Sequence, residues 1–294
     1  MHFNSGSWVV LSSIEQQIKN KIEKFGKPLR EWDINIYRGI LTGYNEAFII
    51  DGETRDKLIS ISPKNDEIIR PILRGRDIQK YTNERANLWL IYVPWHFPLH
   101  KNPLIKGAST ESEKEFQIQY PAIYNHLLTH KTKLSQRNKS ETGIRYEWYA
   151  LQRFGSNYME DFLKPKIIWK RIGSVLRFSY DETKTVCLDS TCFATGSDLK
   201  YILGYLNSSI GKKELLQNAP KTGTGDVITS VQALEPLLIP DGTMEFKKSI
   251  VTLVNKCILS LEKNSEITSI QDEIDSLFIN FYDFTKDELL FLDI

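Results

Sequence analysis

Two stretches of the chain interleave basic and aromatic side chains, a combination that suits nucleic-acid binding. The first runs from Arg70 to Trp95, and the second runs from Arg145 to Arg177. Guanidinium and ammonium groups neutralise phosphates, and the fork of an arginine also matches the edge of a guanine. Aromatic rings can stack on bases, although most rings in such stretches belong to a core. The pattern therefore fits a nucleic-acid interface, and it also fits a solvated charged face over an aromatic core.

The residue spacings expected of a catalytic centre do not occur. A segment with Gly204 and Gly211 superficially resembles a phosphate-binding loop, but its spacing is wrong and Lys213 stands where Ser or Thr would bind magnesium. His126 and His130 lie four residues apart, yet no third metal ligand has a matching spacing. We therefore predict that this chain has no catalytic residues, no metal and no cofactor of its own. The rival interpretation is a nuclease or metal hydrolase with an unrecognised site.

Short strands and helices are expected to position the basic residues. The pattern predicts strands over 35–38, 47–50, 88–93, 166–169, 175–180 and 185–188. A helix is expected after Ser12, which has the capping-box spacing with Glu15, and it stops at Gly26. Two more helices are expected over 121–136 and from the N-cap Asp198 to Ile210. Residues 220–226 are expected to form a loop.

The end of the chain has a different pattern. Beyond Pro240, two apolar stripes at helical spacing are joined by a short turn and predict a hairpin of two helices. Thr285 and Glu288 predict one further capped helical turn. The fold class is therefore α+β, a mixed body with a C-terminal helical hairpin. We predict a helical lead-in over 1–30, a main domain over 31–240 and a helical region over 241–294.

Charge is unevenly distributed along a chain whose net charge is only +1. Residues 53–171 carry 21 basic and 13 acidic side chains, whereas residues 241–294 carry 5 basic and 11 acidic ones. Such asymmetry suggests that one region meets a polyanion, while the acidic end is solvated or contacts protein.

Composition excludes several classes of protein. The chain has 294 residues, of which 41% are hydrophobic and 26% charged, an ordinary balance for a soluble protein with a core. Its apolar runs are far shorter than the roughly 18 residues of a membrane span, and we expect no membrane partner. Three cysteines do not suit a disulfide framework and favour a reducing, cytoplasmic location.

Five blocks of sequence, in order, resemble the TaqI-like C-terminal specificity domain. This domain is the target-recognition module of adenine-specific DNA methyltransferases and of type IIG restriction–modification enzymes. The blocks are 38–48 (RGILTGYNEAF), 69–78 (IRPILRGRDI), 120–127 (YPAIYNHL) with 164–169 (KPKIIW), 203–208 (LGYLNS) and 237–240 (LLIP). The last block and the terminal hairpin are also similar to specificity subunits of type I restriction systems.

The resemblance implies sequence-specific recognition of double-stranded DNA without catalysis by this chain. Family members carry a methyltransferase domain that binds S-adenosylmethionine and contains an Asn-Pro-Pro-Tyr-type tetrapeptide, which is missing here. The cofactor is thus implied only for a methyltransferase domain or subunit, acting in cis or in trans. An alternative is a stand-alone specificity subunit whose helical end docks methyltransferase and nuclease subunits. That hairpin could equally pack on the body of the chain.

Loop residues are the candidates for contact with DNA, because loops can vary without disturbing a core. The candidates are Arg38, Thr42, Tyr44, Asn45, Arg74, Arg76, Lys80, Lys170, Arg171, Lys221, Thr222 and Thr224. For Gly39 and Gly43, which flank the first group, simple turn chemistry is an equally good interpretation. An internal ion pair of Asp77 with Arg74 or Arg76 is a close alternative to DNA contact.

Overall fold

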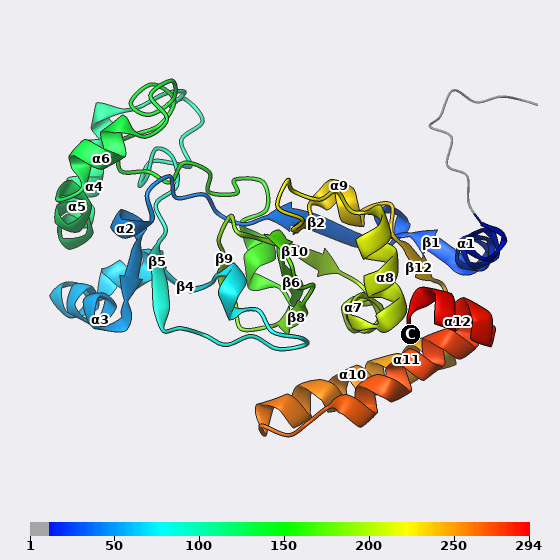
Figure 1. Ribbon diagram of the computed structural model, residues 1–294. Helices are drawn as coiled ribbons and strands as arrows, with labels where there is room; N and C mark the ends of the chain where they lie inside the picture. The colour runs from blue at the N-terminus through cyan, green and yellow to red at the C-terminus, as the bar shows by residue number, and fades with distance from the viewer. Residues whose placement is uncertain (1–11) are drawn as a thin grey trace, which may run out of the picture.

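A four-stranded antiparallel sheet forms the centre of the protein in the computed structural model, which describes residues 12–294 (Figure 1). Its strand order is β2 (Ile34–Arg38), β10 (Thr191–Gly196), β6 (Lys166–Lys170) and β8 (Phe178–Asp181). Strand β10 pairs with β2 on one side and with β6 on the other. Sequentially distant segments therefore meet in this sheet.

The central sheet separates two hydrophobic cores. Side chains of successive strand residues point to opposite faces, so in β6 Ile167 and Trp169 enter one core while Ile168 enters the other. In β10, Phe193 lies on the same side as Ile168, and Cys192 lies on the side of Trp169. With both faces covered, these strands are almost continuously buried.

The core on one face is mainly helical. Its helices are α1 (Ser13–Phe25), α7 (Leu199–Asn207), α8 (Ser209–Asn218), α9 (Val231–Leu234), α10 (Met244–Glu262), α11 (Thr268–Tyr282) and α12 (Lys286–Leu292). Strand β1 (Gly26–Pro28) pairs with β12 (Leu238–Pro240) and ties α1 to this side. Helix α10 packs on α7, where a Cβ at Gly204 would lie 2.6 Å from Ile250 Cγ2. The terminal hairpin therefore packs on the body of the chain, and Figure 1 shows α10 and α11 side by side beneath α7.

The second core is mixed and lies on the other side of the sheet (Figure 1). A smaller sheet has the order β3 (Ile49–Asp51), β5 (Leu88–Ile91), β4 (Ile69–Leu73) and β9 (Val186–Cys187). The helices around it are α2 (Asn45–Phe48), α3 (Gly52–Ile61), α4 (Thr110–Gln119), α5 (Pro121–Leu128) and α6 (Lys131–Gln136).

The remaining short elements are connectors. They are the 3₁₀ turns η1 (Leu29–Glu31), η2 (Pro63–Ile68), η3 (Gly75–Asp77) and η4 (Glu160–Leu163), together with the two-residue strands β7 (Ile172–Gly173) and β11 (Val227–Ile228). Strands β7 and β11 pair with each other next to the end of β6. Among residues 12–294, no helix is long and apolar enough to cross a membrane.

Several expected elements are confirmed. The capping boxes of Ser12 with Glu15 and of Thr285 with Glu288 are both formed. The terminal helical hairpin and the loop over 220–226 are present, and strands occur at or close to most of the expected positions.

Other expectations are wrong in detail. Residues 45–48 form a helical turn instead of the start of a strand, because an unbroken apolar run does not distinguish the two by its period. Asp198 precedes α7 in the left-handed conformation and gives no side-chain cap. The helix expected over 121–136 is interrupted at Thr129 and His130. Ser208 ends α7 and caps a separate helix α8.

Candidate nucleic-acid interface

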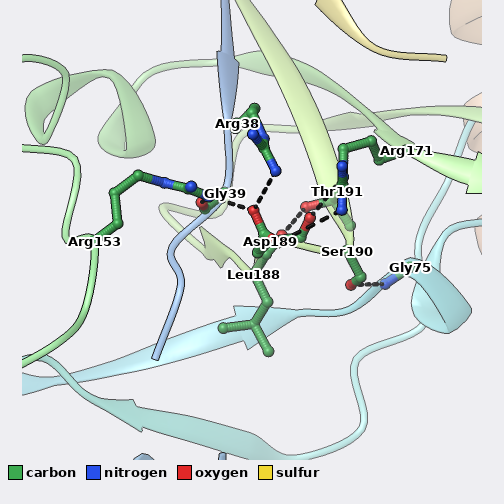
Figure 2. Close-up of polar contacts among 9 residues, drawn as sticks. All are labelled: Arg38, Gly39, Gly75, Arg153, Arg171, Leu188, Asp189, Ser190 and Thr191. Atoms are coloured by element: carbon green, nitrogen blue, oxygen red, sulfur yellow. Dashed lines mark hydrogen bonds and ion pairs between the residues drawn. The ribbon is translucent and has the colours of Figure 1, made fainter. Parts of the chain in front are cut away.

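Three arginines from distant segments converge on the carboxylate of Asp189 (Figure 2). Arg38 lies at the end of β2, Arg153 lies in the loop before η4, and Arg171 follows β6. Arg38 Nη2 lies 3.1 Å from Asp189 Oδ1, and Arg153 Nη2 also binds Oδ1. Arg171 Nη2 lies 3.5 Å from Oδ2, and Arg171 Nε donates to the Asp189 carbonyl at 3.2 Å. We call these four residues the Asp189 cluster.

The turn that carries Asp189 is held by backbone hydrogen bonds to the end of β2. The Asp189 N–H donates to the Ile40 carbonyl at 2.8 Å, and the Gly39 N–H donates to the Thr191 carbonyl at 3.1 Å. A Cβ at residue 39 would overlap the Leu188 carbonyl, so only glycine allows this close approach. Gly39 is therefore required for packing of two backbones, beyond simple turn chemistry.

The Asp189 cluster is unbalanced in charge and open to solvent. Three guanidinium groups face one carboxylate, which leaves a formal surplus of +2. The side chains of Arg38, Arg153 and Arg171 are 43%, 35% and 27% exposed. Each guanidinium has five N–H donors, so bonds to Asp189 leave donors for a ligand. The carboxylate orients the forks and the surplus charge attracts an anion.

An aromatic pair stands beside the Asp189 cluster. The rings of Tyr37 and Tyr158 are stacked with centroids 4.6 Å apart. Burial raises the pKa of Tyr158, and the nearby cations Arg153 and Arg38 oppose this effect. Both tyrosines stay neutral near pH 7, and they help to support the loop that carries Arg153.

The loop around Thr222 is attached to the strand end that carries Lys170 and Arg171. The Thr229 N–H donates to the Arg171 carbonyl at 2.9 Å, and the Thr229 hydroxyl donates to the Lys170 carbonyl at 2.7 Å. Within the loop, the hydroxyls of Thr222 and Thr224 lie 2.9 Å apart, and Lys221 is exposed. The loop of Lys221, Thr222 and Thr224 is thus attached to the end of β6, where Lys170 and Arg171 lie.

Arg74 and Arg76 are two residues apart in the sequence but differ in their contacts. Arg74 binds Asp77 through two contacts, Nε to Oδ2 at 3.0 Å and Nη2 to Oδ1 at 2.7 Å. This hydrogen bonding to Asp77 raises the pKa of Arg74. Arg76 is exposed. The internal ion pair considered from the sequence is therefore formed by Arg74, while Arg76 remains open to a ligand.

The segment from Thr42 to Asn45 lies further along the chain from Gly39. Thr42 is 3% exposed, and its hydroxyl donates to Asn45 Oδ1 at 2.6 Å. The Thr42 carbonyl accepts a hydrogen bond from the buried guanidinium of Arg137. Tyr44 is half-buried, and its hydroxyl donates a hydrogen bond to the Glu46 carboxylate. Thr42 therefore stabilises the turn that presents the exposed side chain of Asn45.

Lys80 lies apart from the Asp189 cluster, against the helical side of the molecule. It lines a cavity of about 740 Å³ together with the turn between α10 and α11. Burial, and then the neighbouring Lys212 ammonium, lower the pKa of Lys80 to about 8. The adjacent Tyr81 hydroxyl donates to Gln271 of α11 at 2.6 Å. This segment anchors the hairpin to the sheet.

Two members of the Asp189 cluster were not among the candidates from the sequence. Arg153 stands in the second basic and aromatic stretch, so composition had marked its neighbourhood. Asp189 carried no sequence signal, because its partners Arg38 and Arg153 lie 151 and 36 residues away. A long-range ion pair of this kind is visible only once the sheet has assembled.

Residues considered for chemistry from the sequence have structural roles. His126 Nε2 lies 3.1 Å from the Ala47 carbonyl, and burial lowers the pKa of this histidine. The three cysteines are buried and unpaired. Within the part of the chain that the structure describes, no three His, Cys, Asp or Glu side chains lie together in a way that could hold a metal ion.

Comparisons with known proteins place this chain in a family. A model of the TaqI-like C-terminal specificity domain matches residues 70–231, more than half of the chain. The chain belongs to this family. It is 23% identical over 288 residues to the type II methyltransferase M.MjaIV of Methanocaldococcus jannaschii. The aligned residues cover 93% of this chain and 89% of that protein.

A solved restriction–modification enzyme has a similar fold over part of its chain. The type IIL enzyme MmeI, solved in complex with DNA, superposes with a TM-score of 0.58 at 12% identity over 91% of this chain and 35% of MmeI. The type IIG restriction endonuclease BpuSI has a TM-score of 0.47 at 12% identity, covering 92% of this chain and 32% of BpuSI. The chain therefore spans about a third of the length of these two enzymes. The likeness to MmeI shows a shared fold, the mixed α+β architecture expected from the sequence.

Proposed function

We propose that this chain recognises a short sequence in double-stranded DNA and holds it for an adenine-specific methyltransferase domain or subunit. The observation that carries the proposal is the Asp189 cluster, in which one carboxylate orients three partly exposed arginine forks. An oriented fork can donate two hydrogen bonds to a guanine edge, which is the commonest specific contact in the major groove. Membership of a specificity-domain family supports the same function.

The division of labour follows from the chemistry of base methylation. An enzyme that modifies a base in a duplex must extrude that base from the stack. A separate domain that grips the rest of the site keeps the duplex in register meanwhile, through phosphate contacts and base contacts. In this proposal the chain supplies recognition, and catalysis belongs to the methyltransferase, with or without an endonuclease in the same protein.

We propose that S-adenosylmethionine binds to the methyltransferase part. In open α/β sheets, such ligands bind at the carboxyl ends of parallel strands. Among the named strands between residues 12 and 294, β4 and β9 form the single parallel pair, and it is two residues long. The described strands therefore offer no sheet edge of this kind, which supports the proposal that the cofactor binds outside this chain's recognition site.

A second candidate function is that of a separate specificity subunit that docks its catalytic partners through the helical end. The observation in its favour is the set of exposed apolar side chains there, including Leu290 at 79% and Met244 at 81% exposure. Most of the apolar stripe of α10 and α11 is used inside the chain, where Val254 and Phe278 are fully buried. The recognition function is common to both alternatives.

Selection from a randomised duplex pool tests the proposal. The chain is incubated with the pool, bound DNA is sequenced, and affinity for the enriched site is measured by fluorescence anisotropy at two salt concentrations. We expect one short site to be enriched, with affinity that falls steeply as salt rises. The variant Arg38→Gln/Arg153→Gln should lose the enrichment. Equal binding of all sequences by the unmodified chain, or no binding at low salt, would overturn the proposal.

A further inference from the structure

A second basic site lies next to the Asp189 cluster. Its centre is a cavity of about 210 Å³ between η3, the end of β6 and the segment before β8. Three basic side chains line it, Arg76, Lys170 and Arg177. Cavities for small organic ligands measure about 300–1,000 Å³, so this one suits a single anionic group better than a whole nucleotide.

The exposed side chain of Lys170 lies beside two glycines at this cavity. A Cβ at Gly75 would lie 3.0 Å from Lys170 Cγ, and a Cβ at Gly173 would lie 3.1 Å from Lys170 Nζ. The side chain thus runs between two backbones that have no side chains of their own. Its neighbour Arg171 binds Asp189 instead, because adjacent residues at a strand end project in different directions. The end of β6 therefore supplies one cation to each of the two basic sites.

The cations of this cavity have no acidic counterpart. Within residues 12–294, no carboxylate forms an ion pair with Arg76, Lys170 or Arg177, although Arg74 and the three arginines around Asp189 all do. Arg177 Nη1 donates to the neutral amide oxygen of Gln79 at 2.7 Å, which orients its fork without cancelling its charge. Arg76 and Arg177 are exposed. Arg76, Lys170 and Arg177 thus place three positive charges without an acidic partner around one small cavity, an arrangement that favours an anionic ligand.

Hydrogen bonds of Ser190 connect the two basic sites. The Gly75 N–H donates to Ser190 Oγ at 3.2 Å, and Ser190 follows Asp189 directly (Figure 2). The Arg171 N–H donates to the Ser190 carbonyl at 2.9 Å. A duplex bound at the Asp189 cluster would therefore bring its backbone close to the cavity.

We propose that the cavity of Arg76, Lys170 and Arg177 binds one phosphate of the DNA backbone and fixes the register of the duplex without reading its sequence. This inference rests on the proposed recognition of DNA. It assigns different roles to two neighbouring sites: the cavity supplies affinity that is independent of sequence, and the Asp189 cluster supplies sequence preference. Phosphate contacts position a protein on DNA, whereas contacts to base edges specify the site.

The test compares the unmodified chain with Arg76→Gln/Arg177→Gln on the selected site and on a random duplex, across a series of salt concentrations. We expect the variant to bind both duplexes roughly tenfold more weakly. The slope of log affinity against log salt should become shallower by about 1. The ratio of the two affinities should stay unchanged. Lys248→Gln/Lys256→Gln is the charge-matched control, since both lysines are exposed on α10, and it should leave all three quantities near their original values.

A second arm locates the phosphate directly. Each phosphate of the selected site is replaced in turn by an uncharged methylphosphonate, and one position should weaken binding of the unmodified chain while leaving the variant unaffected. Thermal melting confirms that the variant is folded.

The possible failures are separable. If the unmodified chain selects no site, the proposed function fails. If it selects a site but Arg76→Gln/Arg177→Gln keeps the same affinity and salt slope, the phosphate site alone is wrong. A loss of preference for the selected site would show that these arginines read bases, and would also overturn the inference.

Discussion

The two ends of strand β6 hold ion clusters of opposite kinds. At its start, Lys166 Nζ lies 2.7 Å from Asp181 Oδ2, and both side chains are fully buried. Directly after its end, Arg171 joins the half-exposed Asp189 cluster, where three cations share one carboxylate. The first cluster is balanced and closed to solvent, and the second is unbalanced and open.

The use of hydrogen-bonding capacity separates the two clusters further. Lys166 also donates to the Phe162 carbonyl at 2.8 Å, and Asp181 accepts from the hydroxyls of Thr183 and Thr185 at 2.6 Å each. Burial raises the pKa of Asp181, but attraction to Lys166 and these hydrogen bonds lower it to a net value below the usual range. A cluster whose charges and donors are all used inside the protein stabilises the fold. A cluster with charges and donors left over is available to a ligand.

Breaking the closed pair should have the largest effect. Lys166→Met leaves Asp181 buried without its cation, and we expect the free energy of unfolding to fall by about 3–5 kcal/mol. Denaturant unfolding of the two proteins measures the difference. Lys166→Met/Asp181→Leu should recover much of the loss, because an apolar pair removes the unpaired charge. A single variant as stable as the unmodified chain would contradict the structural role of this pair.

Glu214 of α8 extends the comparison, because it is a buried carboxyl that forms no ion pair with any cation among residues 12–294. It accepts hydrogen bonds from the Tyr205 hydroxyl at 2.6 Å and the Leu238 N–H at 2.9 Å. Burial, opposed by these hydrogen bonds, raises the pKa of Glu214 to about 7 from its usual value of 4.5. The folded state therefore holds this proton more tightly than the unfolded chain does.

The sign of the resulting pH dependence follows from that pKa. The stabilising contribution is complete below about pH 4.5 and is lost as pH rises to about 7. Between pH 5 and pH 7.5 we expect the loss to amount to about 2–3 kcal/mol. Unfolding measured at pH 5 and pH 7.5 should show this loss in the unmodified chain and not in Glu214→Gln. The same pH dependence in both proteins would contradict the assignment.

Removing the carboxylate of the open cluster should change recognition more than stability. Asp189→Asn keeps the shape of the side chain but releases Arg38 and Arg153 from their charged partner. We expect preference for the selected site over random DNA to fall roughly tenfold, because the forks lose their orientation. Binding to random DNA should stay equal or strengthen, since one negative charge is lost.

Competitive binding with the two duplexes measures this preference. Asp293→Asn is the matched control, because Asp293 is 93% exposed and pairs with Lys213 at the helical end. Unchanged preference in Asp189→Asn would show that the carboxylate does not orient the arginines for recognition.

The sequence alone predicts features whose signals are local, and it does not predict contacts that the sheet brings together. Arg38 and Arg171 are candidates from the sequence because the first block of the resemblance contains Arg38 and the second basic and aromatic stretch contains Arg171, and the structure brings both to Asp189. The capped helices were found because their signals lie within four residues. Asp189 was not found, because its role depends on partners brought close by the sheet. Strand β10 was also missed, since Thr191–Gly196 is buried on both faces and shows no alternation.

The smallest and most selective change is Arg171→Lys, which preserves charge and alters shape. Arg171 reaches both the carboxylate and the carbonyl of Asp189, through Nη2 and Nε. A lysine has a single ammonium and cannot reproduce a planar fork. If Arg171 presents its fork to a base, preference for the selected site should fall severalfold while the slope of affinity against salt stays the same.

Lys170→Arg next to it is the matched comparison at the proposed phosphate site, with an opposite expectation. At a phosphate site, charge matters more than the shape of the cation, so preference and salt slope should both remain near their original values. Competitive binding and salt titration of the two variants measure both quantities. Equal behaviour of the two variants would show that the two basic sites do not differ in role. A fall in preference confined to Arg171→Lys requires that the orientation set by Asp189 is used to read sequence.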